Sequence, residues 1–199
     1  MIDDAVTHWA RSPWPGGRVL GDPGAHLDSE LLVDGLAALA PPPSGSGLVH
    51  ALVCRQADEQ RTTPGQVRLC PDQGVIGDRW IHGSADPQMQ VALMRVDVAH
   101  LVAGGQHPAF FGDNILVDMD LSVDQMPPGI QLRVGTASCV VAEAPHNPCN
   151  QFASRFGMAA FRLVADKRWQ ADRLRGVYLQ VVSPGVVAPG DRIEVLKRR

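Results

Sequence analysis

Lysine is nearly absent from this 199-residue sequence, which contains only Lys167 and Lys197. A covalent bond to pyridoxal phosphate requires a lysine that is buried and has a lowered pKa. Lys167 falls on the polar face of an expected helix, and Lys197 lies in a Lys-Arg-Arg tail. We therefore expect no covalently bound pyridoxal phosphate.

Long apolar segments are also missing. No run approaches the roughly 20 residues that a helix needs to span a bilayer. The acidic start Met1-Ile2-Asp3-Asp4 lacks the apolar stretch of a secretory signal. The net charge of −3 and the pI near 6.1 argue against a surface for nucleic acid or an anionic membrane. We expect a cytoplasmic protein, in which an anionic ligand would need a local cluster of arginines.

The cysteines include no Cys-x-x-Cys pair, which argues against a structural zinc site. In a reducing compartment, all of them should be free thiols. Cys54, Cys70 and Cys139 alternate with apolar residues in expected strands and are interpreted as core residues. Only Cys149 lies in a different kind of segment.

The first 47 residues are expected to form an N-terminal extension. Residues 1–26 show no sustained period, which indicates an irregular segment that packs by its tryptophans or stays mobile. A helical pattern follows, with Asp28 or Ser29 as its cap, and the prolines at 41–43 end it. After a Pro/Gly/Ser linker, the main domain should cover residues 48–199.

The main domain is rich in short β-prone runs bounded by Gly, Pro or Asp. The expected strands cover residues 48–54, 66–70, 90–96, 114–117, 131–134, 137–142, 177–182 and 192–196. Helices are expected at 96–103 and 151–170, and Gly157 is a point where the second helix would break. The pattern predicts a mainly β fold with some α structure: a closed or nearly closed β-barrel with a few peripheral helices.

Cys149 ends a loop that should be stiff, Pro145-His146-Asn147-Pro148-Cys149. Each proline fixes its own φ and restricts the residue before it to extended conformations. The spacing of Phe152 and Phe156 then indicates a helix that begins near the thiol, where a thiolate would be stabilised. These residues alone leave two interpretations open: a functional thiol, or a small buried side chain.

Five short motifs follow one another along the main domain. They are Gly-Val-Ile-Gly-Asp-Arg-Trp at 74–80, Gln-Val-Ala-Leu at 90–93, Gly-Asp-Asn-Ile at 112–115, Leu-Arg-Val-Gly at 132–135 and Pro-His-Asn-Pro-Cys at 145–149. Their order and spacing resemble the MOSC family, which is named for the C-terminal domain of molybdenum cofactor sulfurases and also has stand-alone bacterial members. The resemblance implies a MOSC-like β-barrel over residues 48–197.

The resemblance also implies two alternative roles for Cys149. It either ligates the molybdenum of a pterin cofactor or carries a sulfane sulfur, and a thiolate suits both roles. His146 is a candidate general acid or base, or a group that polarises the thiol. The alternative for His146 is a surface histidine that bonds a loop carbonyl.

The resemblance places Asp113 and Asn114 in the cofactor pocket, and His82 is a weaker candidate for the same pocket. Arg79 would pair with a pterin phosphate through its planar fork, or else with Asp78 or Asp113 as a scaffold.

A charged turn supplies two further arginines. Arg173 and Arg175 would contribute a phosphate contact if both faced the cleft. A solvated charged turn is the alternative.

The sequence departs from the family pattern in three places. The usual Gly-Glu-Asn is Gly112-Asp113-Asn114, which shortens the acid by one methylene. His146 stands where many members have an arginine ahead of the Pro-Cys pair. Residues 1–47 are too few for the N-terminal β-rich domain of the mitochondrial amidoxime reductases.

The leading hypothesis is a stand-alone enzyme that binds a molybdenum-pterin cofactor through Cys149 and reduces an N-hydroxylated or similar small molecule. The chain has no flavin, haem or iron-sulfur motif, so such a reductase would need a separate electron-donor protein. The alternative is a non-reducing sulfur carrier or cofactor-handling protein with a persulfide on Cys149. A third hypothesis is a MOSC-derived scaffold that has lost the cofactor.

Overall fold

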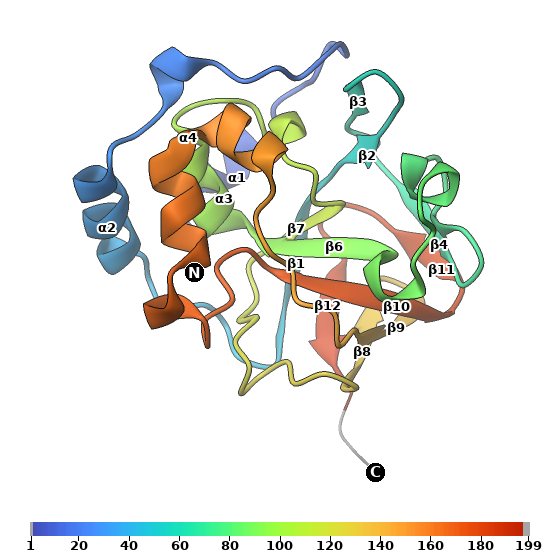
Figure 1. Cartoon of the computed structure of the whole chain (residues 1–199). Helices are drawn as coiled ribbons and strands as arrows, with labels where there is room; N and C mark the ends of the chain where they lie inside the picture. The colour runs from blue at the N-terminus through green and yellow to red at the C-terminus, as the bar shows by residue number, and fades with distance from the viewer. Residues whose placement is uncertain (1, 197–199) are drawn as a thin grey trace.

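Seven strands close into a barrel in the computed structural model, which describes residues 2–196 (Figure 1). In barrel order they are β1 (Ser46–Leu52), β12 (Arg192–Val195), β8 (Gln131–Val134), β9 (Ala137–Val141), β10 (Val177–Ser183), β6 (Val91–Arg95) and β7 (Ile115–Val117). β1 also pairs with β7, which closes the ring. The predicted mainly β barrel is confirmed.

One pair of barrel strands is parallel, β6 with β7. Parallel neighbours need a crossover connection, and α3 (Val96–Ala103) lies within this one. The bounds of α3 match the predicted helix. The chain returns from α3 through a short 3₁₀ helix, Pro108–Phe110, and reaches Asp113 and Asn114 directly before β7.

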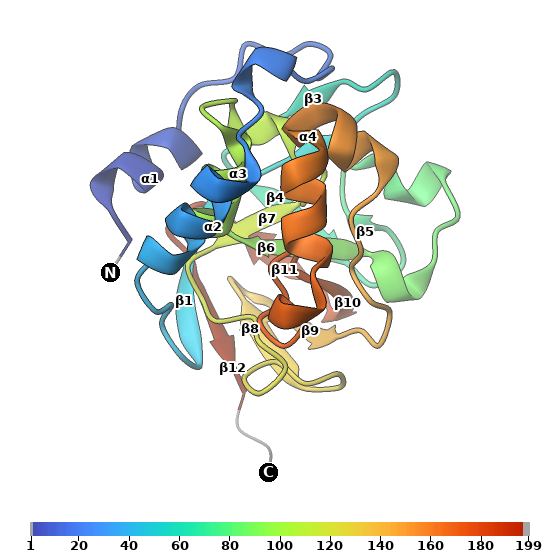
Figure 2. The same cartoon turned by 60° about the vertical axis from the view of Figure 1, so that its left-hand side comes forward.

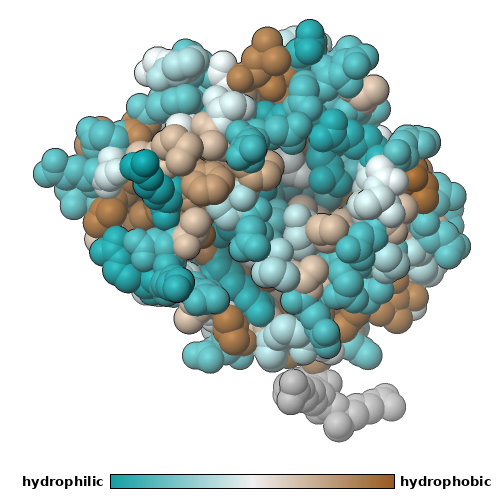
Figure 3. Space-filling view, in the orientation of Figure 1, coloured by the Kyte–Doolittle hydropathy of each residue, from teal (hydrophilic) through white to brown (hydrophobic). Residues whose placement is uncertain are grey.

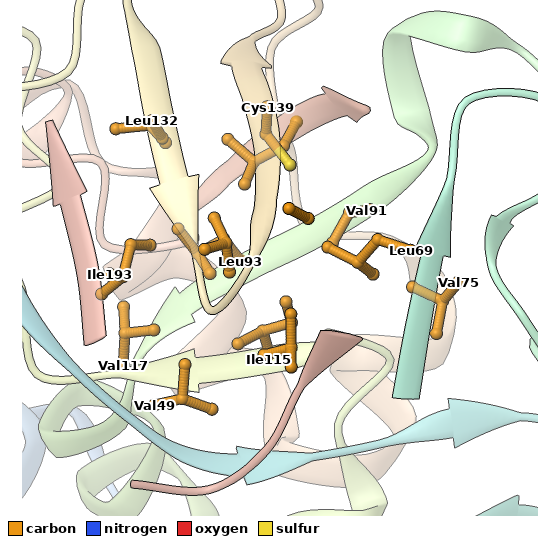
Figure 4. Packing of buried hydrophobic residues seen from close by; sticks show 14 of the residues in the cluster. Val49, Leu69, Val75, Val91, Leu93, Ile115, Val117, Leu132, Cys139 and Ile193 are labelled. Atoms are coloured by element: carbon orange, nitrogen blue, oxygen red, sulfur yellow. The ribbon is translucent and has the colours of Figure 1, made fainter. Parts of the chain in front are cut away.

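The barrel interior is filled by apolar side chains from strands on all sides (Figure 4). Val49, Leu93, Ile115 and Ile193 are fully buried there. Cys139 lies in the same core, where burial raises the pKa of its thiol to about 12.

The other two cysteines interpreted as core residues differ from each other. Cys54 is buried, and burial is the main cause that raises the pKa of its thiol to about 12. Cys70 is only half-buried, at the end of β4 (Val67–Cys70).

The helices gather on one side of the barrel (Figures 1 and 2). α1 (Asp4–Ala10), α2 (Ser29–Ala38), α3 and α4 (Asn150–Ala165) share a second apolar core that includes Leu32, Phe111 and Phe156. Of the two predicted caps, Asp28 is the one that caps α2, by accepting a hydrogen bond from the amide of Leu31 at 2.9 Å. The predicted long helix ends earlier than expected: α4 stops at Ala165, and a 3₁₀ turn, Lys167–Trp169, follows.

The prediction of an irregular segment over residues 1–26 is wrong for α1. Asp3 caps this helix through its carboxylate, which accepts from the amide of Ala5 at 2.9 Å. Val6 and Ala10, one turn apart, are buried against the second core. The segment does pack by a tryptophan, because Trp9 donates from Nε1 to the carbonyl of Gln106 at 2.8 Å.

Smaller sheets flank the barrel. The predicted strand at 66–70 is β4, which joins β5 (Gly74–Val75) and β11 (Gly185–Val187) in a separate sheet. The predicted strand at 48–54 is divided, because β2 (Cys54–Arg55) leaves the barrel to pair with β3 (Arg61–Thr62). The β2–β3 hairpin and the 3₁₀ helix η2 (Arg79–His82) carry residues of the candidate site.

The face of the molecule shown in Figure 3 is mostly hydrophilic, with apolar side chains gathered in several groups between the hydrophilic ones. Within residues 2–196, no helix is both long and apolar enough to cross a membrane. The division of the chain into an extension, 1–47, and a barrel domain, 48–199, stays a prediction. Lys197, one of the two lysines, lies outside the described residues.

Candidate functional site

Cys149 is the N-cap residue of α4 and is exposed. Its side chain makes no capping hydrogen bond. The first turns of α4 are held by Phe156, whose ring stacks on Phe111 with centroids 4.3 Å apart. Gly157 then interrupts the helix with φ +86° and ψ 162°, at the predicted break. The thiol is therefore presented by a short helical segment that is anchored in the second core.

Cys149 lines a narrow hollow of about 120 Å³, which we call the Cys149 hollow. Its wall carries five arginines: Arg55, Arg61, Arg79, Arg155 and Arg175. A wide hollow of about 1130 Å³ adjoins it, and Arg55, Arg79 and Tyr178 line both. In a chain with a net charge of −3, the thiol thus lies where guanidinium groups are concentrated.

His146 forms part of the wall of the Cys149 hollow. Its side chain is 3% exposed, and its ring packs on Tyr178 with centroids 4.1 Å apart. Burial, together with the charges of Arg175 and Arg55, lowers the pKa of His146 well below 6.5, so the imidazole is neutral. The alternative of a surface histidine does not describe this side chain.

Asp113 lies behind the hollow and is fully buried. Its Oδ1 accepts a hydrogen bond from Nη1 of Arg175 at 2.6 Å and lies 3.7 Å from Nδ1 of His146. Arg175 also lies over the ring of Phe152, at 4.9 Å from its centroid. Asp113 therefore holds Arg175 by a hydrogen bond and lies close to the ring of His146 without bonding to it.

The turn with Arg173 and Arg175 is not solvated as a whole. Arg175 is buried and lines the Cys149 hollow. Arg173 points elsewhere and donates to the carbonyl of Met126 at 2.5 Å. Only one of the two arginines therefore faces the thiol.

Asn114 connects three segments of the chain through hydrogen bonds. Its backbone amide and side-chain Oδ1 form a pair of hydrogen bonds with Ala92 of β6, at 2.8 and 3.0 Å. Its Nδ2 donates to the carbonyl of Val53 and to Oδ2 of Asp78, at 3.2 and 3.0 Å. The amide is fully used in joining β6, the end of β1 and the start of η2.

Arg79 and His82 come from η2, which Asp78 caps by accepting from the amide of Trp80 at 2.9 Å. The carboxylate of Asp78 is also bound by Arg55, with Nη2 2.7 Å from Oδ1. Arg79 pairs with neither carboxylate proposed from the sequence, and instead approaches Glu59, with Nη1 3.6 Å from Oε1. His82 is exposed and lines the wide hollow.

A family model described as the MOSC domain matches residues 78–194, which is more than half of the chain. The chain belongs to the MOSC domain family. No curated protein matches it.

Solved structures show that other proteins share the MOSC fold of this chain. The YuaD protein of Bacillus subtilis is 18% identical with a TM-score of 0.58, and the match covers 80% of this chain and all of YuaD. YiiM of Escherichia coli is 19% identical with a TM-score of 0.51, covering 76% of this chain and 71% of YiiM. YiiM of Geobacillus stearothermophilus is 16% identical with a TM-score of 0.51, covering 76% and 74% of the two chains.

The predicted site residues divide into three groups in this MOSC protein. Cys149, His146 and Arg79 line the Cys149 hollow, and His82 lines the wide one. Asp113 and Asn114 lie behind these walls and hold other groups in place.

Sequence reasoning missed several residues that line the Cys149 hollow. Arg155 had a usable signal, since it lies between Phe152 and Phe156 on the apolar face of α4 and a charged residue there needs a partner. No sequence signal pointed to Arg61 or to Glu59 beside it. Both belong to a hairpin that the sequence did not predict, and both lie outside the residues that match the MOSC family model.

Proposed function

We propose that this MOSC protein binds a molybdenum-pterin cofactor through Cys149 and reduces N-hydroxylated or similar small molecules. The observation that carries the proposal is the exposed thiol at the edge of an arginine-lined hollow that adjoins a much wider one. Family membership supports the same conclusion, because the family takes its name from molybdenum cofactor sulfurases.

The donor set fits such a cofactor. Within residues 2–196, no group of three or more His, Cys, Asp or Glu side chains is placed to hold a metal ion by itself. A single soft thiolate suits a metal whose other ligands come from an organic cofactor. The arginines suit a phosphate group on that cofactor.

The roles of the surrounding residues follow from their positions. Cys149 would hold the metal, and Arg79 and His82 border the wide hollow, where the pterin would lie. The bound cofactor would supply a two-electron reduction of N–OH to N–H with release of water. The electrons would come from a separate donor protein.

Two protons are consumed in that reduction. These protons would come from solvent. The neutral ring of His146, beside Tyr178 at the wall of the Cys149 hollow, would donate a hydrogen bond from its one N–H, or relay a proton by accepting one from water as it gives one up. Asp113 would keep Arg175 in position, and Asn114 would keep η2 against the barrel.

Reduction of an N-hydroxylated base by a chemically reduced viologen tests the function, with protein purified from a molybdenum-replete host. Cys149→Ser should lower the rate by about a hundredfold or more, since loss of groups that merely support a metal ligand costs 10–100-fold. Cys70→Ser is the matched control, because Cys70 is half-buried and lines neither hollow. Equal rates in wild type and Cys149→Ser would contradict the proposal.

The exposure of Cys149 also favours the second candidate, a sulfur carrier. Its thiolate would attack the outer sulfur of a donor persulfide, form a new S–S bond and release the donor thiolate. Incubation with a cysteine desulfurase and cysteine should then add the mass of one sulfur to wild type and none to Cys149→Ser. A free thiol that does not load would exclude this candidate.

A further inference from the structure

Glu59 lies at the tip of the β2–β3 hairpin, and its carboxylate enters the arginine cluster of the Cys149 hollow. Oε2 contacts Nη2 of Arg155 and lies 3.6 Å from Nη2 of Arg61. Oε1 lies 3.6 Å from Nη1 of Arg79 and accepts a hydrogen bond from Nε2 of Gln151 at 3.0 Å. One carboxylate thus serves three of the five arginines that line the hollow.

The backbone that carries this carboxylate is strained. Asp58 and Glu59 both have left-handed conformations, with φ +52° and +60°. Two consecutive residues with side chains in this region cost free energy and persist only where other contacts enforce them.

The N-terminal segment supplies some of those contacts. The amide of Val19 donates to the carbonyl of Glu59 at 3.1 Å, and Nε of Arg18 donates to the carbonyl of Asp58 at 3.1 Å. Nε of Arg155 in turn donates to the carbonyl of Val19 at 3.3 Å. The segment around Val19 is therefore clamped between the hairpin tip and α4.

Arg61 keeps an unused hydrogen-bond donor despite the nearby carboxylate of Glu59. Arg61 is 1% exposed, and its Nε has no hydrogen-bond partner. Burial, and next to it the charge of the neighbouring Arg155, lower the pKa of Arg61 to about 10, and Glu59 opposes this shift only in part. A guanidinium buried in this way points to an anion with more acceptor oxygens than a carboxylate has.

We propose that Arg61, Arg79 and Arg155 form a seat for the phosphate group of a ligand, and that Glu59 is the chain's own occupant of that seat. A phosphate presents more oxygens than a carboxylate to the forked donors of arginine. The Cys149 hollow, at about 120 Å³, has roughly the volume of four water molecules. It can hold such a group beside the thiol once Glu59 turns away.

The contacts from which the phosphate seat is inferred involve no metal. Only the use of this seat in catalysis rests on the proposed function. Its phosphate could belong to the cofactor or to a phosphorylated substrate, which present the same chemistry. In either case, the incoming anion must displace the carboxylate of Glu59 from the arginines before it can bind.

Calorimetric titration of the full chain with inorganic phosphate tests the seat. Glu59→Gln keeps the side-chain length and removes the competing charge, so it should bind phosphate about tenfold tighter than wild type or better. Asp58→Asn is the matched control. It removes the same charge from the neighbouring left-handed residue, whose side chain is exposed, and should change affinity less than about twofold.

Two more variants keep the test decisive. Glu59→Asp retains the charge but shortens its reach, so it should bind phosphate tighter than wild type, and this comparison remains if Glu59→Gln does not fold. Arg79→Gln, which changes the most exposed of the three arginines, should reverse the gain in the Glu59→Gln background. Equal phosphate affinity in wild type, Glu59→Asp and Glu59→Gln would overturn the proposal.

Two further experiments identify the source of the phosphate and separate the seat from the proposed function. If cofactor-loaded Glu59→Gln no longer binds added phosphate, the cofactor's own phosphate fills the seat; if it still binds, the seat serves another ligand. Cys149→Ala should leave phosphate binding by Glu59→Gln intact. A failure of molybdenum binding would therefore not remove the seat, and a failure of the seat would not decide the role of Cys149.

Discussion

Oδ1 of Asp113 accepts a hydrogen bond from Nη1 of Arg175 at 2.6 Å and lies 3.7 Å from Nδ1 of His146. The carboxylate is fully buried, and the side chains of its two neighbours are less than a tenth exposed. An acid one methylene shorter than the usual glutamate therefore still reaches both groups that line the Cys149 hollow. The aspartate in the Gly-Asp-Asn motif can therefore still take part in the site.

Asp113→Asn should destabilise the protein by about 3–5 kcal/mol, because it leaves the guanidinium of Arg175 buried without its counter-charge. Urea denaturation followed by circular dichroism gives the free energy of unfolding. Asp166→Asn is the control, since its partner Arg168 is exposed and Asp166 is only partly buried, so loss of this ion pair should change little. Equal effects of the two substitutions would contradict the account of Asp113.

Burial of neutral His146 should make stability depend on pH. Its folded pKa is below the ordinary value near 6.5, so the unfolded state binds more protons as the pH falls. The stabilisation is present above pH 6.5 and decreases below it, with a slope of at most about 1.4 kcal/mol per pH unit from this residue.

The measurement is the free energy of unfolding between pH 7.5 and about pH 5. His146→Gln should flatten the slope, whatever its effect on the overall level. His100 and His107 also have lowered pKa values, mainly through burial, and should leave a residual slope. His8→Gln, at an exposed position on α1, should keep the wild-type slope. A slope unchanged in His146→Gln would show that this imidazole is not held neutral.

Gly157→Ala should destabilise the protein by about 1–3 kcal/mol and disturb the presentation of Cys149. Its φ of +86° is open to glycine, and a Cβ there would lie 2.9 Å from Cγ of His26. Gly65→Ala is the control, because a Cβ at that position meets nothing within 4 Å, and it should change stability by less than about 0.5 kcal/mol. Thermal unfolding and the rate of Cys149 alkylation report the two effects.

Local patterns predicted the elements that local chemistry determines. The apolar period over Val96–Ala103 predicted α3. The proline-bracketed loop left open a functional thiol or a buried side chain at Cys149, and the structure exposes it. The seven residues of α1 are too few for a helical period to be recognised beside the prolines and glycines that follow.

The ion pairs of the site depend on contacts that sequence spacing does not encode. Arg155 and Glu59 are 96 residues apart, and Arg175 and Asp113 are 62 apart. Arg79 is an example. The sequence suggested Asp78 or Asp113 as its partner, but in the structure Arg79 approaches Glu59 of the β2–β3 hairpin. Which arginine meets which carboxylate is decided by where the hairpin, α4 and η2 lie in the folded chain.

The central claim, that Cys149 ligates the metal of a molybdenum-pterin cofactor, is tested most directly by the molybdenum and pterin content per chain. Wild type and Cys149→Ala would be purified in parallel from a molybdenum-replete host, and elemental analysis would be combined with fluorescence of the oxidised pterin. The account predicts molybdenum and pterin near one per chain in wild type, with molybdenum lost in Cys149→Ala. Wild type without molybdenum, or a variant that retains it in full, would contradict the claim.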